Sequence, residues 1–226
     1  MEGKDCMNNV VKADNKPLNI SLLWDSKDES EWKAALTHYD EILDANQIEI
    51  ENRINTLNVK EIKSYSTKEF YNFLYNEYFV WKFTAKNRLV TTRNSLIRYE
   101  KENRFDELEK IKINIFNLNH SDIKICLKTA MEIHGLGTAG ASGLLSVLFP
   151  EDFGTVDQFV VKALCDIKDL EEHNELIKIN PDRISLNAGV LLISIMRRKA
   201  AELNKCFNTN YWTPRKIDMI LWCIGR

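Results

Sequence analysis

Apolar residues recur at steps of three or four along most of this chain, which is the spacing of amphipathic helices. The clearest early example lies between Ser30 and Leu57. Ser30 is a preferred N-cap residue. The pattern therefore predicts one long amphipathic helix, whose apolar positions are Trp32, Leu36, Tyr39, Leu43, Ile50, Ile54 and Leu57.

The rest of the chain predicts more helices and no convincing strand. With only 8 Gly and 4 Pro in 226 residues, turns are few, which favours long helices over many short strands. Asn180-Pro181-Asp182 breaks the pattern, and Thr213-Pro214 has the form of an N-cap followed by proline at the first helical position. We predict an all-α fold, with helices over 67–84, 104–118, 122–133, 138–149 and 157–165, from about 183 to 206, and from 214 to the end.

Composition narrows the class of protein. A hydrophobic content of 44% supports a sizeable core without disulfides or metal. The formal net charge is −2 and the pI is about 6.1, so charge alone does not predict nucleic-acid binding. Any contact with DNA must come from a local basic patch or from backbone groups.

The cysteines and the apolar runs predict a cytoplasmic protein without a membrane partner. The five cysteines include no C-x-x-C pair and have neither zinc nor iron–sulfur spacing. A reduced compartment is the simplest interpretation. The longest apolar run, Val190–Met196, is too short to cross a bilayer, and the first sixteen residues lack the apolar core of a signal peptide.

Charge is unevenly distributed. The predicted Ser30–Leu57 helix is acidic, which fits a solvated surface face or, because its spacing approaches a heptad, a face that binds a partner or a second copy. Residues 82–104 are the most basic part of the chain and are interleaved with aromatics. Within them, Arg88 and Arg93 are candidates for phosphate contact, although an ordinary solvated face has the same composition.

The most informative stretch begins at Ile133. Gly135 and Gly137 flank Leu136 between two helical periods, which suits a tight turn in which Leu136 points inward. Ala141 then falls on the face that packs against the preceding helix. The new helix would present unpaired backbone N–H groups around Gly137, and such donors suit a phosphate even in a protein of low net charge. A plain glycine turn between helices is the alternative.

The stretch from Ile133 to Leu164 resembles the helix-hairpin-helix DNA glycosylase superfamily, which includes endonuclease III, AlkA-type and 8-oxoguanine glycosylases, and it is most similar to their uncharacterised bacterial relatives. In that superfamily an essential Asp lies about twenty residues after the second hairpin glycine, where this chain has Asp157. The resemblance implies two packed helical subdomains with DNA across the cleft between them. The central one would be 67–164, with the hairpin element at 122–149, and the other would be 21–66 with 165–226, after a loose polar tail over 1–20.

The resemblance also implies a set of binding residues. Main-chain carbonyls of Met131, Ile133 and Leu136 would hold a monovalent cation, K⁺ or Na⁺, and no other cofactor is expected. With Arg88 and Arg93, the residues that would contact DNA are His134, Gly135, Leu136, Gly137, Thr138, Ala139 and Gly140.

Three departures from the family pattern shape the expected chemistry. Ala139 stands where the glycosylase/lyases carry a lysine nucleophile, His134 replaces the usual proline, and Phe159 replaces a common histidine. We therefore expect a monofunctional glycosylase that hydrolyses the N-glycosidic bond and leaves the strand intact. A non-catalytic protein that binds DNA or a partner is the alternative.

Asp157 and two tryptophans each have two interpretations, and Asp218 has one. Asp157 would stabilise positive charge on the sugar in the transition state, while a plain helix N-cap is its structural alternative. Trp212 and Trp222 are expected to pack the last helix, although an extruded base also needs an aromatic partner. Asp218 is expected only to cap and close that helix.

Overall fold

The structure, a computed structural model, describes residues 19–226, and all of its regular structure there is helical. The predicted all-α class is therefore confirmed. The tail predicted over 1–20 lies outside the described residues except for Asn19 and Ile20, which cap and begin the first helix.

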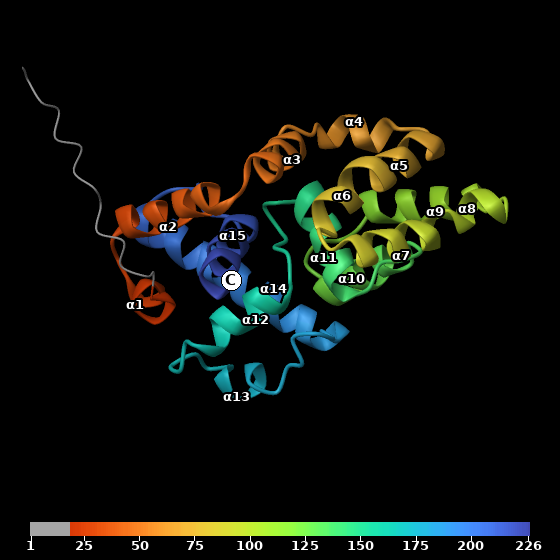
Figure 1. The fold of residues 1–226 in the computed structure, drawn as a ribbon. Coiled ribbons are helices and arrows are strands. Elements are labelled where there is room, and N and C mark those ends of the chain that lie inside the picture. Colours follow the sequence, from red (N-terminus) through yellow and green to blue (C-terminus); the bar gives the residue numbers. More distant parts are fainter. Residues whose placement is uncertain (1–18) are drawn as a thin grey trace, which may run out of the picture.

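The helices follow one another along the chain as shown in Figure 1. They are α1 (Ile20–Asp25), α2 (Glu29–Ile42), α3 (Ala45–Asn55), α4 (Val59–Ser64), α5 (Thr67–Phe73), a π-helical turn η1 (Leu74–Tyr78), α6 (Phe79–Lys82), α7 (Lys86–Leu96), α8 (Arg98–Lys101), α9 (Phe105–Phe116), α10 (Ile123–Met131), α11 (Thr138–Leu148), α12 (Gln158–Cys165), α13 (His173–Leu176), α14 (Leu186–Phe207) and α15 (Pro214–Gly225).

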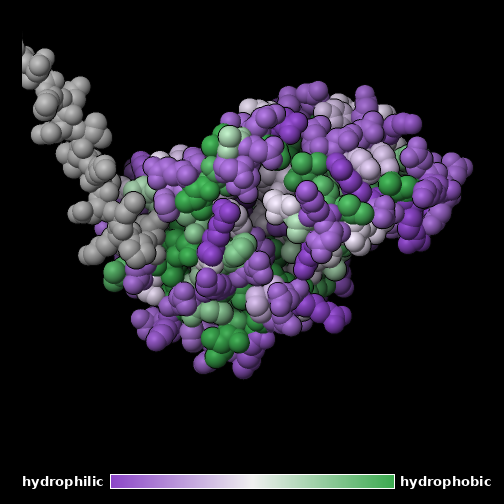
Figure 2. All heavy atoms as spheres, viewed as in Figure 1, coloured by the Kyte–Doolittle hydropathy of each residue, from purple (hydrophilic) through white to green (hydrophobic). Residues whose placement is uncertain are grey.

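The helices form two groups that share one core. Figure 1 shows α4 to α11 on one side and α1, α2 and α12 to α15 on the other, with α3 between them. The last helix, α15, packs against α2, α12 and α14, and α14 also contacts α10 and α11. Buried apolar side chains run continuously through both groups. Hydrophilic residues cover most of the face in Figure 2, with hydrophobic residues in small areas between them.

The prediction of a single helix from Ser30 to Leu57 is wrong. The segment is two helices, and the first is capped by Asp28 rather than Ser30. The apolar spacing continues across the break. However, the Asp44 carboxylate accepts a hydrogen bond from the Gln47 N–H, and Gln47 Oε1 accepts one from the Asp44 N–H. This capping box begins a new helix at Ala45. The structure also adds α1, α4, α7, α8 and α13, which the pattern did not predict.

The turn between α10 and α11 follows the glycine pattern. Gly135 adopts φ +94°, and a Cβ there would lie 2.9 Å from the Thr92 carbonyl oxygen, so only glycine fits without strain. Leu136 is buried, as predicted, and Gly137 is the N-cap of α11. Later in the chain, Asp157 caps α12 and Thr213-Pro214 begins α15, as the sequence signals indicate.

Candidate functional site

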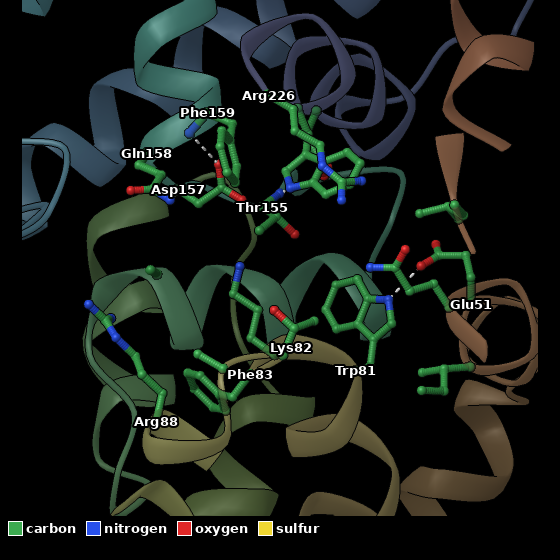
Figure 3. A pocket seen from close by; sticks show the side chains of 18 of the residues that line it. Glu51, Trp81, Lys82, Phe83, Arg88, Thr155, Asp157, Gln158, Phe159 and Arg226 are labelled. Carbon is green, nitrogen blue, oxygen red and sulfur yellow. Dashed lines mark hydrogen bonds between the residues drawn. The ribbon is translucent and has the colours of Figure 1, made fainter. Parts of the chain in front are cut away.

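A cleft of about 710 Å³ lies between the two groups of helices. Its walls come from α2, α3, α6, the start of α7, the first turn of α11, the segment before α12, and α15 (Figure 3). Both signs of charge line it, so the cleft as a whole is not a strongly basic surface. The lining includes six residues singled out from the sequence: Arg88, Ala139, Asp157, Phe159, Asp218 and Trp222.

Side chains of α11 and α15 fix the segment that carries Asp157. The Val156 N–H donates to Ser142 Oγ at 2.9 Å, and the Thr155 hydroxyl bonds to Ser146 Oγ at 2.9 Å. The Thr155 N–H donates to Asp218 Oδ2 at 2.6 Å. These bonds are buried. They set where the backbone places Asp157 relative to the cleft.

The Asp157 side chain caps a helix and also faces the cavity. Its Oδ1 accepts the N–H groups of Phe159 at 2.9 Å and Val160 at 3.1 Å, which satisfies two free donors of α12. Its Oδ2 has no hydrogen bond to any residue between 19 and 226. Figure 3 shows the carboxylate directed into the cleft. The capping interpretation and the placement in a cleft therefore hold together.

An ionic network joins α3, α6 and α15 at one end of the cleft. Arg215 donates to Glu51 at 2.6 Å and to Asp218 at 2.8 Å, and the Trp81 indole N–H donates to Glu51 at 2.6 Å. The Arg215 guanidinium also lies over the Trp81 ring, 5.0 Å from its centroid. Burial raises the pKa of Asp218 to about 7, although Arg215 and the Thr155 N–H oppose the shift. Asp218 thus holds the Asp157 segment, a role the sequence did not predict.

Lys82 is a second residue that sequence analysis missed. It ends α6, and its side chain crosses the cleft toward Asp157 (Figure 3). Burial lowers the pKa of Lys82, against the opposing carboxylates of Asp157 and Asp218. In the sequence it was counted with the basic residues 82–104. The signal that could have singled it out is its place between Trp81 and Phe83 in an aromatic run.

The first turn of α11 presents backbone donors without a capping side chain. Gly137 makes no side-chain cap bond, and a Cβ there would meet nothing within 4 Å. The N–H groups of Thr138, Ala139 and Gly140 have no acceptor among residues 19–226. The donors predicted from the sequence are thus unpaired there, and Ala139 borders the cleft.

The other predicted contacts are arranged differently. The His134 ring stacks on Tyr99 at 4.1 Å between centroids, with Glu107 3.5 Å from Nε2, and burial lowers the pKa of His134. A stacked, uncharged imidazole is poorly suited to a phosphate. The Arg93 guanidinium donates twice to the Tyr75 carbonyl and lies over the Tyr75 ring. The structure therefore brings Arg88, and not Arg93 or His134, to the cleft.

The two tryptophans have different environments. Trp212 is buried and packs edge-on against Trp32, as the packing interpretation predicts. Trp222 is half-buried, contacts the Tyr39 and Phe159 rings, and lines the cleft. The Arg226 guanidinium lies over the Trp222 ring, 5.0 Å from its centroid.

Several features that would define other classes of site do not occur between residues 19 and 226. No group of three or more His, Cys, Asp or Glu side chains is arranged for a metal ion there. No helix in that range is long and apolar enough to cross a membrane.

No family model, no curated protein and no solved structure matches the chain.

Proposed function

We propose that this protein excises an altered base from DNA by hydrolysing the N-glycosidic bond. The observation that carries the proposal is the position of Asp157. It stands twenty residues after Gly137, the register of the essential aspartate in the superfamily that the chain resembles, and it faces an open cleft of about 710 Å³. That volume is typical of small-molecule sites and accommodates an extruded nucleotide.

The proposed chemistry uses the free oxygen of Asp157. Breaking the bond between sugar and base builds positive charge on the sugar, and a fixed carboxylate stabilises that charge and orients the attacking water. Oδ1 is occupied by two backbone donors, which leaves Oδ2 for this task. The bonds from Ser142, Ser146 and Asp218 hold the segment in advance, so little reorganisation is needed.

DNA would be held mainly by backbone groups. The unpaired N–H groups of Thr138 to Gly140 and the dipole of α11 suit one phosphate. Arg88, exposed at the edge of the cleft, supplies a second, salt-sensitive contact. These contacts need no strongly basic surface, in keeping with the net charge of −2.

The carbonyls of Met131, Ile133 and Leu136 would bind a monovalent cation in the same turn. The Ile133 carbonyl accepts one N–H, from Leu136 at 3.0 Å, and keeps a second lone pair. Gly135, with its positive φ, reverses the chain between these carbonyls. A cation there would stiffen the turn, so the melting temperature should be higher in K⁺ or Na⁺ than in a bulky organic cation at equal ionic strength.

A screen of duplexes with different damaged or modified bases, scored for abasic sites, tests the proposal. Asp157→Asn should retain folding and DNA binding, because Asn caps a helix about as well as Asp. It should lower the rate of base release by about 10² or more. The matched control is Asp152→Asn, since Asp152 bonds to His120 outside the cleft and should leave the rate unchanged.

The same screen separates the enzyme from the alternative. DNA binding without release of any base would favour a non-catalytic DNA-binding protein. The remaining alternative, a partner or second copy on the acidic face of residues 30–57, stays open, with that face divided between α2 and α3 at Leu43-Asp44.

A further inference from the structure

A buried glutamate joins the two groups of helices at one end of the cleft. Glu51 lies on α3, between the groups, and only 7% of its side chain is exposed. Its Oε2 accepts the indole N–H of Trp81, on α6, at 2.6 Å (Figure 3). Its Oε1 accepts a guanidinium N–H of Arg215, on α15, also at 2.6 Å. One carboxylate is thus bonded to both walls of the cleft.

The same network continues to the segment that carries Asp157. A second N–H of Arg215 donates to Asp218 Oδ1 at 2.8 Å. The other oxygen of that carboxylate, Oδ2, accepts the Thr155 N–H at 2.6 Å. Thr155 precedes Asp157 by two residues. Consecutive bonds therefore connect Glu51, through Arg215 and Asp218, to the backbone that sets the position of Asp157.

Stability alone explains the Glu51–Arg215 pair poorly. Removing a carboxylate and a guanidinium from water costs about as much free energy as their attraction returns, so apolar side chains of similar shape would join two helices at least as well. Hydrogen bonds differ from apolar contacts in having a preferred direction. Because both oxygens of Glu51 are occupied by donors from opposite walls, the pair restricts how α6 and α15 lie relative to each other.

The relative position of the two walls matters for the proposed reaction. The groups proposed to hold DNA, Arg88 and the first turn of α11, belong to the same group of helices as Trp81, whereas Asp157 belongs to the other group (Figure 1). DNA held on one wall meets the Asp157 carboxylate only if the walls keep their separation and angle. A misplacement of about 1 Å can lower a rate by about 10².

We propose that Glu51 is a positioning residue, which fixes through Arg215 and Asp218 where the Asp157 carboxylate stands relative to the bound DNA. The inference rests on the proposed function, because it concerns the step in which Asp157 acts. Glu51 itself does not take part in that step, since both of its oxygens are occupied. Packing of α14 against α10 and α11 also joins the two groups of helices, so loss of the Glu51 bonds would shift the walls without separating them.

Two variants break the link at different bonds. Glu51→Gln keeps the shape of the side chain, but its amide nitrogen cannot accept a hydrogen bond, so one of the two donors is left unpaired. Trp81→Phe removes the indole donor and keeps a ring beneath the Arg215 guanidinium. Each variant should lower kcat by about tenfold or more, with KM and the Kd for DNA unchanged. The double variant should be no slower than the slower single variant, because both changes break the same link.

The matched control is Glu202→Gln. Glu202 also accepts a donor on each oxygen, from Lys199 at 2.7 Å and from Lys27 at 3.2 Å. These three residues belong to one group of helices and lie outside the cleft lining. The control variant should therefore keep the wild-type kcat.

Hydrogen exchange without DNA keeps this inference separate from the proposed function. The Thr155 amide reports whether Asp218 still holds the segment of Asp157, because its N–H donates to that carboxylate. We expect this amide to lose protection in Glu51→Gln and in Trp81→Phe, and to keep it in Glu202→Gln. Amides in the middle of α9 should exchange as in the wild type in every variant.

Wild-type exchange at Thr155 in both variants would overturn the inference even if base release is observed. Loss of protection in α9 as well would overturn it too, because Glu51 would then contribute only to overall stability. A weaker affinity for DNA at unchanged kcat would count against it in the same way. Loss of protection confined to the segment around Thr155, in a protein that releases no base, would support the positioning role of Glu51 and refute the proposed excision.

Discussion

The buried network of Glu51, Arg215 and Asp218 should make the stability of the protein depend on pH. Its carboxylates, Glu51 and Asp218, both bond to the Arg215 guanidinium. Removal from water raises the pKa of Asp218 to about 7 from its ordinary value of 3.8, although Arg215 opposes the shift. The folded state therefore holds a proton on Asp218 that the unfolded chain releases above about pH 4. Stability from this group is complete below about pH 4 and is lost as pH rises toward about 7.

The size of the effect follows from linkage. Between the two pKa values, stability falls by about 1.4 kcal/mol per pH unit, or roughly 2–3 kcal/mol between pH 5 and pH 7. Asp218→Asn mimics the protonated carboxyl at every pH and should remove this slope. Urea unfolding of both proteins at about pH 5 and about pH 8 measures it. The variant should gain on the wild type by roughly 2–3 kcal/mol at the higher pH, whereas an equal difference at both values would refute the reasoning.

Two further predictions follow from particular contacts. Gly154→Ala should destabilise the fold by about 1–3 kcal/mol in urea unfolding, because its Cβ would lie 2.6 Å from the Pro214 carbonyl oxygen. Arg88→Glu should weaken binding to every DNA sequence and reduce the salt slope by about one unit for each phosphate that the protein no longer neutralises; an unchanged slope would place Arg88 outside the interface.

Local signals in the sequence predicted the helix boundaries that depend on neighbouring residues. Asp157 and Thr213-Pro214 begin helices because capping is decided within one turn. Gly135 turns the chain because only glycine tolerates its φ. The break at Asp44 was missed because its capping box competes with an apolar pattern that continues through it.

The long-range contacts of the cleft could not be derived in this way. Glu51 and Arg215 are 164 residues apart, and the sequence around either one does not indicate the other. The same holds for Lys82, whose exposure to the cavity depends on where α6 meets α11. Arg93 was a candidate for phosphate contact because the sequence around it does not reveal its acceptor. In the structure its guanidinium donates to the Tyr75 carbonyl, which belongs to a different helical segment. Charge and spacing predicted candidates, and tertiary packing decided which of them reach the site.

Hydrogen exchange in the presence of DNA tests most directly the claim that the first turn of α11, beside this cleft, holds a DNA phosphate. The ligand is a duplex with a stable abasic analogue, and the reporters are the backbone amides of Thr138, Ala139 and Gly140, which have no acceptor among residues 19–226. We predict that these amides exchange more slowly in the complex, as a phosphate accepts their hydrogen bonds. Binding that leaves them unprotected, with slower exchange only at other helices, would contradict the account.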